Sequence, residues 1–570
     1  MVVSLCFKNN TMKFSEIISA NRSLNETVDG QRYNISIISN IMVHQSKDIC
    51  EFLLRSDGIN AEVTLGDYDN IVQDCEMFKK SDAVIIFWEV CNFIDGLHYT
   101  ADSLTDKEFE NIIDKTKTEI DLVLASLKTT PIVVINKFSS IIFDQFSLSK
   151  GNLKRLIDIL NNYIENKSCS NLILIDIDEI ISRISIENAV DLRSYYSSKT
   201  LYSILFYREY FSSINQIFLS SGGKAKKALI FDCDNTLWKG ILGEDGFDGI
   251  HMYKDVQHAA IQLANKGVLI GLCSKNNKED VDEVLENHPD ILLQEKHIVI
   301  KKVGWENKAT SLLKIAEELN IGIDSLVFVD DSSFEVGLIR DELPDVTVFQ
   351  ISKKSYEHHS MMNKISNLFY NPATTNEDLN RIAMYKSQIK RNEDSKNITN
   401  IDTYLSSLEI VLKIEIDSEI QAPRIAQMTQ KTNQFNLTTK RYSESDILNF
   451  IKSDDKIVIS LDVKDKYGSN GITGLVILCK TSSCIDTFLL SCRIIGRKIE
   501  YALMDSVIQI AVDNGIEGLS AEFIRTIKNN QVEHFYKSCG FDVISESQDL
   551  NKYFIYNARY VNSVITYKKE

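Results

Sequence analysis

Two aspartates that follow a short apolar run could bind a divalent cation and cleave a phosphate ester. Asp232 and Asp234 form an Asp-x-Asp-x-Thr arrangement with Thr236, directly after the strand-like segment Ala228–Phe231. An α/β sheet usually presents its site at the carboxyl end of such a strand. Two carboxylates at positions i and i+2 could share one cation there, whose charge would offset a phosphoryl group. The competing interpretation is an acidic turn that caps the next element, and an isolated Asp-x-Asp pair favours it.

Three more polar positions at the ends of predicted elements favour the chemical interpretation over the acidic turn. A second buried strand, Gly267–Cys273, ends at Ser274, and a third, Ser325–Val329, ends at an Asp-Asp pair that begins with Asp330. Between them, Lys308 lies in the first turn of a helix predicted over 305–319. The sequence therefore predicts one site that combines carboxylates, a hydroxyl and a cation.

In this order, the polar positions resemble motifs I to IV of the haloacid-dehalogenase (HAD) superfamily of phosphohydrolases. The resemblance implies that Asp232 is the nucleophile that forms an aspartyl-phosphate. It implies that Asp234 is the acid that protonates the leaving oxygen and later activates water. The residues implied to hold phosphoryl oxygens are Ser274, Lys308, Thr236 and Asn276. Those implied to bind Mg²⁺ are Asp232, Asp234, Asp330 and Asp331. Two alternatives stay open: Thr236 could order the loop, and Asp331 could orient a bound water.

The short spacing of the motifs predicts an open site. Only a flap, one helix and one strand fit between Asp232 and Ser274, and the stretch from Ser274 to Lys308 is shorter still. HAD enzymes that act on small molecules usually carry a cap domain in one of these intervals. The absence of room for a large cap suggests that a bulky substrate, such as a protein-tethered group, reaches the site.

Four segments together are similar to the FkbH-type HAD proteins (subfamily IIIC): 232–238, 274–277, 305–308 and 328–335. The likeness runs from about residue 190 to about residue 560. It implies a Mg²⁺-dependent enzyme of polyketide-type pathways that takes a glyceryl unit from 1,3-bisphosphoglycerate. The unit would be loaded on the phosphopantetheine thiol of an acyl carrier protein (ACP).

Cys233 stands between the two aspartates of the first motif and has two interpretations. A buried cysteine behaves as a small hydrophobe. A thiol beside a cation-rich site has a lowered pKa and could receive an acyl group as a thioester. The second interpretation makes Cys233 a transient carrier of the glyceryl group.

The first 220 residues alternate predicted strands and helices, which implies a parallel sheet covered on both faces. This layout resembles a flavodoxin-like or SGNH-hydrolase-like domain. Ser39 follows the first strand, but it is not part of the Gly-Asp-Ser motif that such hydrolases use. Asn92, after a later strand, could correspond to one of the sequence blocks of that family. The favoured interpretation is a scaffold or docking domain without its own active site. The predicted strands are 34–38, 61–65, 83–88, 132–135 and 172–175.

The predicted HAD-like domain spans 222–375, a linker follows over 376–403, and residues 404–570 form a third domain. In this last domain, the order of strand, Arg-x-x-Gly loop, helix and strand resembles the GNAT acyltransferase fold. The fold class is therefore multidomain α/β, with a GNAT-like α+β domain at the end. The predicted strands of this domain are 411–416, 457–462, 473–479, 485–491 and 518–523.

The loop of the GNAT-like domain predicts a pantetheine site. Backbone amides at a helix N-terminus can cradle the phosphates of a pantetheine cofactor. Arg493, Gly496 and Arg497 are the residues that would bind it, and the two arginines could pair with the phosphate of an ACP arm. Lys498 departs from the usual pattern, which has Gly or Ala at this position, so ordinary acetyl-CoA binding is in question.

Two further segments of this domain resemble those that accompany the FkbH-type domain. The first is Lys431–Thr439 and the second is Leu490–Arg493. The second contains Cys492, for which a cysteine packed at a strand end is favoured over a thioester carrier.

Length and charge limit the remaining possibilities. A chain of 570 residues is too long for one core, and its net charge of −17 argues against nucleic acid and anionic membrane as partners. Eleven scattered cysteines fit a reducing compartment. The N-terminus lacks a signal-peptide layout and no apolar run is long enough to span a membrane, so we expect a cytoplasmic protein.

Three functional hypotheses follow from the sequence. The first is glyceryl loading of ACP, with the GNAT-like domain gripping the pantetheine arm. The second is a HAD phosphatase fused to an N-acyltransferase in sugar or surface-polymer assembly. The third is a carrier-docking subunit with idle chemistry, and the intact set of catalytic residue types argues against it.

Overall fold

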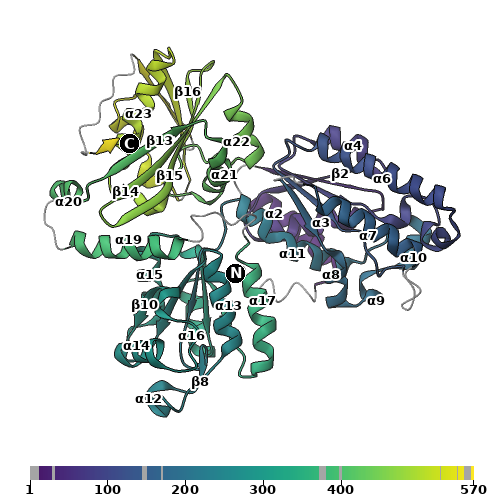
Figure 1. The fold of residues 1–570 in the computed structure, drawn as a ribbon, viewed down its shortest axis with the longest axis horizontal. Helices are drawn as coiled ribbons and strands as arrows, with labels where there is room; N and C mark the ends of the chain where they lie inside the picture. Colours follow the sequence, from purple (N-terminus) through teal and green to yellow (C-terminus); the bar gives the residue numbers. More distant parts are fainter. Residues whose placement is uncertain are drawn as a thin grey trace. The chain divides into compact units, whose positions relative to one another are not determined.

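The computed structural model describes residues 12–28, 32–143, 151–167, 171–370, 380–396, 401–526, 528–547, 550–556 and 567–569 (Figure 1). Contacts within the chain define two compact units. Residues 2–219, with the short segment 443–446, form one unit, and residues 220–442 and 447–570 form the other. The smaller unit holds one sheet, and the larger unit holds two sheets and a two-stranded flap.

The first unit contains the expected parallel sheet. Its strands run in the order β2-β1-β3-β4-β5, and every neighbouring pair is parallel. The strands are β1 Tyr33–Ser39, β2 Ala61–Tyr68, β3 Ala83–Phe87, β4 Ile132–Asn136 and β5 Leu172–Ile175. All residues of β3 and β4 are buried, as expected of central parallel strands that helices cover on both faces.

Helices of the first unit cover both faces of this sheet. They are α2 Phe14–Thr27, α3 His44–Ser56, α4 Ile71–Phe78, α5 Leu97–Thr100, α6 Asp106–Ser126, α7 Asn152–Glu165, α8 Ile177–Ile184, α9 Ile186–Ala189, α10 Leu192–Ser198 and α11 Ile204–Ser221. One face packs on α4, α6 and α7. On the other face, Phe87 contacts the rings of Tyr207 and Tyr210 from α11, at centroid distances of 5.7 and 4.8 Å.

The central domain contains a second five-stranded parallel sheet, in the order β10-β9-β6-β11-β12. The strands are β6 Ala228–Phe231, β9 Leu269–Ser274, β10 Ile298–Val303, β11 Leu326–Asp330 and β12 Thr347–Gln350. Helices α13 Lys254–Asn265, α14 Lys278–Asn287 and α17 His358–Asn367 pack on one face. Helices α15 Lys308–Glu318 and α16 Ser333–Glu342 pack on the other. The predicted helix over 305–319 therefore begins at Lys308 itself.

A small flap is the element that follows β6. It consists of the antiparallel pair β7 Trp238–Lys239 and β8 His251–Met252, with one turn of helix, α12 Leu242–Asp245, between them. Within residues 228–350, all of which the structure describes, the intervals from Asp232 to Ser274 and from Ser274 to Lys308 hold this flap, α13, α14, the strands β9 and β10 and short connections. The central domain therefore has no large cap.

The C-terminal domain contains a mixed eight-stranded sheet in the order β18-β19-β17-β16-β15-β14-β13-β20. Its strands are β13 Val411–Ile416, β14 Lys456–Asp465, β15 Gly468–Cys479, β16 Cys484–Leu490, β17 Gly518–Ile524, β18 Asp542–Glu546, β19 Leu550–Tyr556 and β20 Lys568–Lys569. Its helices are α20 Ile401–Ser407, α21 Ala422–Lys431, α22 Glu444–Ile451, α23 Ile499–Asp513 and α24 Phe535–Ser538. Most neighbouring strands are antiparallel, but two pairs, β13 with β20 and β16 with β17, are parallel. The second parallel pair is expected for strands joined by a loop and helix α23.

The predicted linker contains an ordered helix, α19 Arg381–Lys396, that packs against other elements. Its Tyr385 is buried in the core of the central domain, and its Arg391 is buried against the C-terminal sheet. Residues 376–379 and 397–400 of the predicted linker lie outside the described residues. The helix is therefore part of the packed structure of the second unit.

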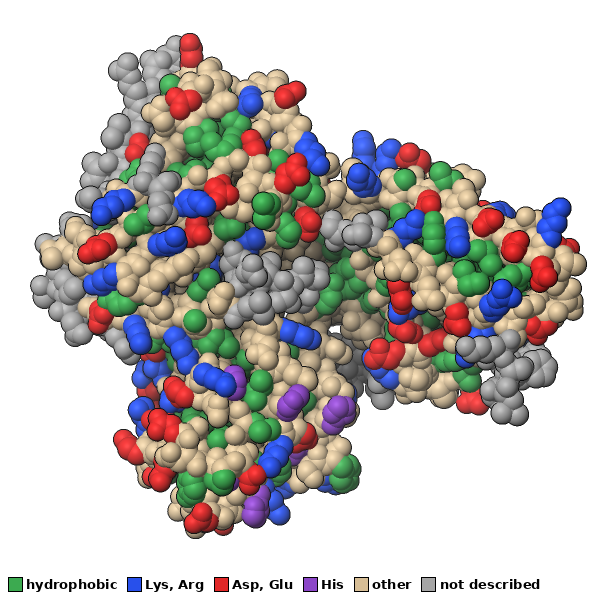
Figure 2. All heavy atoms as spheres, in the orientation of Figure 1, with side chains coloured by type: hydrophobic (Ala, Val, Ile, Leu, Met, Phe, Trp, Pro, Cys, Tyr) green, Lys and Arg blue, Asp and Glu red, His purple; other side chains and the backbone are tan. Residues whose placement is uncertain are grey.

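Two surface properties bear on possible partners. Among the residues that the structure describes, no helix combines the length and apolar character needed to cross a membrane. On the face drawn in Figure 2, acidic and basic side chains are interspersed. That face offers no extended basic area of the kind that binds nucleic acid.

Candidate active site

Local backbone structure places Asp232 at the carboxyl edge of the central sheet. The four residues of β6 are fully buried, and the amide of Asp232 continues the strand pairing by donating to Val329 O at 2.9 Å. Asn235 then adopts a left-handed conformation with φ 53°, which asparagine tolerates better than most residues. This turn ends the strand and directs the chain into the flap.

A buried lysine joins two of the predicted carboxylates. Lys308 Nζ lies 2.9 Å from Asp232 Oδ1 and 2.6 Å from Asp330 Oδ2. Burial opposes the charge of Lys308, but the two carboxylates hold the pKa of Lys308 above its ordinary value. Burial raises the pKa of Asp232 to about 7, although Lys308 opposes this effect. The three groups from β6, α15 and β11 are thus brought together as the sequence predicts.

Three carboxylates can provide ligands for one cation. Oxygen atoms of Asp232, Asp330 and Asp331 lie within 4.8 Å of one another. Carboxylate oxygens are the ligands that Mg²⁺ prefers, and a dication would offset the charge that gathers here. The residues present therefore fit a Mg²⁺ ion. They are three of the four predicted metal ligands.

The fourth predicted ligand, Asp234, is held elsewhere. Its Oδ1 accepts hydrogen bonds from Trp238 Nε1 at 2.9 Å and from the amide of Leu242 at 3.1 Å, and its Oδ2 accepts from Asn276 Nδ2 at 3.0 Å. The structure does not bring the Asp234 carboxylate into the cluster formed by the other three. Donors from the flap and from Asn276 hold both oxygens of this partly buried carboxylate, and the acid role of Asp234 stays a prediction.

The predicted phosphate-binding residues gather at the same edge. Ser274 and Asn276 are buried, and Asn276 Nδ2 donates to Ser274 Oγ at 3.2 Å. Thr236 is fully buried, and its hydroxyl makes no hydrogen bond to any described residue. Thr236 lies inside the turn after Asp234, which fits its alternative role in ordering the loop.

Cys233 belongs to the hydrophobic core and is 0% exposed. Burial raises the pKa of the Cys233 thiol well above its ordinary range, and the nearby carboxylate of Asp232 raises it further. An activated thiol has the opposite properties: it is partly exposed and its pKa is lowered. The geometry is that of a small core residue.

Two site residues were not identified from the sequence in these roles. Trp238 is fully buried in the flap, and its indole N–H donates to Asp234. The spacing of four residues within a turn is the sequence signal that suggests this contact. Lys275 pairs with the buried carboxylate of Glu335 on α16, at 2.6 Å. No local pattern links Lys275 to Glu335, because the two residues belong to separate elements.

The predicted pantetheine-binding residues of the C-terminal domain are occupied by contacts within the chain. Gly496 has φ 87°, which explains the need for glycine in this loop. The Arg497 guanidinium is buried and contacts Asp465 Oδ2 at 2.9 Å, Asn470 Oδ1 and the backbone oxygen of Arg493. A phosphate that reached Arg497 would have to displace Asp465. The pantetheine role of these residues stays a prediction.

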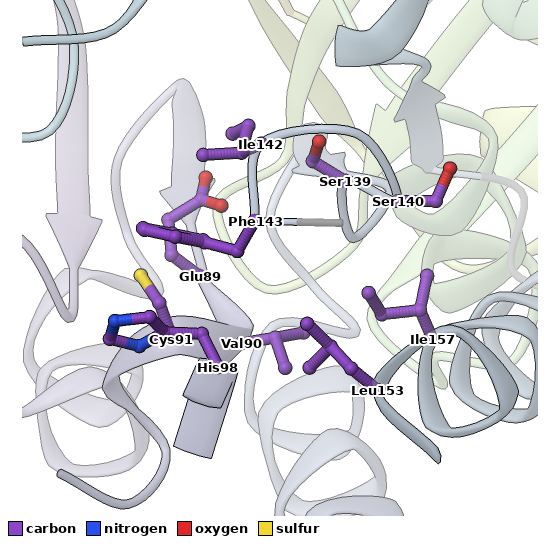
Figure 3. A pocket seen from close by; sticks show the side chains of 10 residues that line it. All are labelled: Glu89, Val90, Cys91, His98, Ser139, Ser140, Ile142, Phe143, Leu153 and Ile157. Atoms are coloured by element: carbon purple, nitrogen blue, oxygen red, sulfur yellow. The ribbon is translucent and has the colours of Figure 1, made fainter. Parts of the chain in front are cut away.

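The candidate residues of the N-terminal domain make hydrogen bonds within the chain. The hydroxyl of Ser39 is buried and donates to Ile41 O at 2.6 Å, and Asn92 Nδ2 donates to Tyr68 Oη at 2.9 Å. A cavity lies after the ends of β3 and β4, where Figure 3 shows Glu89, His98 and Ser139. Its volume of about 10 Å³ holds about one water molecule. The role of this domain as a scaffold or docking domain stays a prediction.

Comparison with known proteins supports the fold. No family model and no curated protein matches the chain. The chain is similar to the crystal structure of the N-terminal part of protein BF1531 from Bacteroides fragilis, which contains a phosphatase domain and is complexed with Mg. The similarity covers 64% of this chain and 100% of that one, at 21% identity and a TM-score of 0.56. It therefore includes more than the central domain alone, and it shows that the two chains share a fold.

Weaker similarities concern about a quarter of the chain. Spermidine N-acetyltransferase from Vibrio cholerae, in complex with CoA and spermine, matches 26% of this chain and 98% of its own, at 15% identity and a TM-score of 0.21. A putative acetyltransferase from Acinetobacter baylyi matches 26% of this chain and 93% of its own, at 13% identity and the same TM-score.

Proposed function

We propose that the central domain is a Mg²⁺-dependent phosphohydrolase of the HAD type. The observation that carries the proposal is the joint position of Asp232, Lys308, Asp330 and Asp331 at one edge of a parallel sheet. Structural ion pairs within a core also bring carboxylates and lysines together. A structural ion pair needs only two partners. Here a third carboxylate, Asp331, and a partly exposed carboxyl held by three donors, Asp234, lie at the same edge of the sheet.

The residues can perform phosphoryl transfer in two steps. Asp232 attacks the phosphorus atom, so that an aspartyl-phosphate bond forms while the bond to the leaving oxygen breaks. Asp234 gives its proton to that oxygen and then takes a proton from the water that attacks the aspartyl-phosphate. Ser274 and Lys308 contact the phosphoryl oxygens. Mg²⁺, held by Asp232, Asp330 and Asp331, would supply positive charge to the same group.

The finer part of the proposal concerns the substrate. We infer a phosphoglyceryl donor such as 1,3-bisphosphoglycerate, whose glyceryl unit is loaded on the phosphopantetheine thiol of an acyl carrier protein. In this step the thiol sulfur bonds to the acyl carbon, the bond from that carbon to the 1-phosphate oxygen breaks, and the thiol proton is released. Hydrolysis of the remaining 3-phosphate ester at Asp232 leaves the glyceryl unit. The support is the FkbH-type resemblance together with the small flap, which leaves the site open to a substrate attached to another protein.

The route of the acyl group is the remaining question. In the predicted route Cys233 carries the glyceryl group, but its thiol lies in the core. The structure therefore favours direct transfer from the acyl phosphate to the ACP thiol. A Cys233→Ala protein that loads ACP at the full rate would support direct transfer, and loss of loading with intact phosphatase activity would restore the cysteine route.

Intact-protein mass spectrometry tests both levels of the proposal. The protein is incubated with Mg²⁺ and freshly generated 1,3-bisphosphoglycerate, with and without phosphopantetheinylated ACP, and released phosphate is measured in parallel. A glyceryl-sized gain on ACP that depends on the enzyme supports the loading reaction. Phosphate release without that gain leaves a phosphatase. Asp232→Asn is the matched control and should release no phosphate. If the unchanged protein neither releases phosphate nor loads ACP, the proposal as a whole is contradicted.

A further inference from the structure

The mixed sheet of the C-terminal domain opens into a wedge between its two central parallel strands. Strands β16 and β17 pair only at Cys484 with Ser520 and at Ile485 with Ala521. Beyond these pairs the strands separate, so that backbone groups on the facing edges need other partners. Backbone groups buried in a core are almost always paired. The wedge is therefore a site for an extended chain that carries amide groups.

A segment of the same chain fills this wedge. The amide of Leu437 donates to Phe488 O at 3.1 Å, and the amide of Leu490 donates to Phe435 O at 2.9 Å. On the other side, the amide of Ile524 donates to Leu437 O at 2.8 Å. We call Phe435–Thr438 the insert segment, and it lies within Lys431–Thr439, one of the two segments singled out from the sequence. The insert segment thus joins β16 to β17.

The insert segment is part of the core. All four of its residues are buried, and the Phe435 ring lies 6.0 Å from the Phe488 ring and 5.3 Å from the Phe535 ring, between centroids. Asn529 Nδ2 donates to Asn436 O at 2.9 Å. The insert segment therefore fills the wedge as part of the domain core.

The insert segment lies where the arm of a pantetheine cofactor would lie. A pantetheine whose phosphates lay on the loop 491–498 would run beside β16, because this loop directly follows β16. The two amides of pantetheine need N–H and C=O partners, and the edge of β16 that β17 leaves carries such groups. Phe488 O and Leu490 N of that edge already bond to the insert segment.

A second segment covers the loop itself. Helix α19 places Met384 Sδ 2.6 Å from Arg493 Nη1 and Tyr385 Oη 3.5 Å from Cys492 Sγ. Gln388 of the same helix accepts a hydrogen bond from Arg497. The insert segment thus occupies the edge of β16 where a pantetheine arm would lie, and α19 occupies the loop 491–498 where its phosphates would lie.

Helix α19 and the residues just before the insert segment also contact the central domain. Next to the insert segment, Asn433 Nδ2 donates to Gly223 O at 2.7 Å, and Lys431 O accepts from Lys227 Nζ at 3.2 Å. From α19, Lys386 Nζ donates to Glu295 O at 2.6 Å. Residues 223, 227 and 295 precede strands of the central sheet, so these contacts lie at the end opposite Asp232.

We propose that the C-terminal domain binds two segments of its own chain, the insert segment and α19, at the place of an acyl-pantetheine arm, and thereby clamps the central domain. In this role the domain is a docking module and does not transfer acyl groups from CoA. The proposal does not depend on the chemistry at Asp232. It disfavours the hypothesis of a phosphatase fused to an N-acyltransferase. It also implies that the pantetheine arm of an ACP reaches the open site of the central domain.

Binding of coenzyme A to the full-length protein tests the first half of the proposal. Titration calorimetry with CoA and acetyl-CoA up to about millimolar concentration should show no saturable heat, while an active acyl-CoA transferase serves as the positive control. Hydrogen exchange should show the amides of Leu437, Leu490 and Ile524 to be as protected as core strands, with no change on addition of CoA. Saturable CoA binding would overturn the proposal, whether or not these amides lose protection.

Substitution of the clamp residues tests the second half. The double variant Asn433→Ala, Lys386→Ala should increase the exchange rate of the α19 amides at least fivefold, with Lys390→Ala, exposed on the same helix, as the matched control. Hydrolysis of p-nitrophenyl phosphate reports whether the central domain stays folded. Unchanged exchange in the double variant would contradict the clamp.

Discussion

The indole nitrogen of Trp238 donates to Asp234 Oδ1 at 2.9 Å, so that a residue of the flap holds the proposed acid of the central site. The same oxygen accepts from the amide of Leu242, and Asn276 binds the other oxygen. Flap and acid are therefore one structural unit. The flap fixes the direction in which Asp234 can deliver a proton.

Replacement of Trp238 by phenylalanine tests this coupling. Trp238→Phe removes one hydrogen bond to the carboxylate that Asp234 becomes as it gives up its proton, a contribution of about 1.5–3 kcal/mol. We expect kcat for p-nitrophenyl phosphate to fall about 10- to 100-fold, with little change in KM, because substrate contacts remain. Trp305→Phe is the matched control, since Trp305 is exposed. An equal effect of both substitutions would contradict a positioning role for Trp238.

Replacement of Lys308 tests the charge balance of the site. Lys308→Met leaves the buried carboxylates of Asp232 and Asp330 without their cation, which costs about 3–5 kcal/mol when one partner of a buried pair is removed. Mg²⁺ should restore part of this stability, because its charge replaces that of the ammonium group. Hydrogen exchange of the β6 and β11 amides, with and without Mg²⁺, measures both effects.

The control for Lys308 is available on the same helix. Lys314 pairs with Glu306 at the surface, so Lys314→Met should change these exchange rates little, with or without Mg²⁺. If Mg²⁺ fails to protect the Lys308→Met protein, the assignment of the three carboxylates to one cation is wrong.

The sequence predicts the catalytic edge well for a physical reason. In a parallel sheet every strand ends at the same edge, so a polar residue after a buried strand is placed before any tertiary contact is known. Asp232 and Asp330 follow this rule. The separation of Asp234 from the metal-binding carboxylates does not follow from it, because that separation depends on a turn and on donors from the flap.

The sequence says little about the insert segment and α19. Leu437 pairs with backbone groups of Phe488 and Ile524, which belong to strands far away in the sequence, and its own segment has no strand-like alternation. Arg497 has the position of a phosphate ligand in a loop, and only the fold shows that Asp465 neutralises it. The backbone pairing of Leu437 and the ion pair of Arg497 both join residues that are far apart in the sequence, so they become visible only in the folded domain.

The N-terminal domain should show a pH-dependent stability that originates at Glu89. Burial raises the pKa of Glu89 from 4.5 to about 7, although a hydrogen bond from Tyr202 Oη at 2.7 Å opposes the shift. Between these pH values the folded state keeps a proton that the unfolded state loses. Stability is therefore present at pH 5 and is lost as the pH rises through 7.

Hydrogen exchange of the β3 amides in the full-length protein measures this effect. The free energy of opening should fall by about 2–3 kcal/mol between pH 5 and pH 8, as a shift of this size implies. Glu89→Gln cannot ionise and should remove most of that decrease, whereas Glu76→Gln, at an exposed position, should leave it in place. A pH dependence that persists in Glu89→Gln would assign it to another group.

Asp465 should contribute strongly to the clamped arrangement of α19. Its carboxylate is fully buried between two guanidinium groups, at 2.8 Å from Arg391 and 2.9 Å from Arg497. Asp465→Asn leaves two buried cations without a counter-charge, so we expect the C-terminal domain to lose about 3–5 kcal/mol of stability. Exchange of the α19 and β15 amides should rise together, because α19 is held through Arg391. Asp454→Asn, at an exposed position of the same domain, is the control. A rise confined to β15 would show that α19 docks without this ion pair.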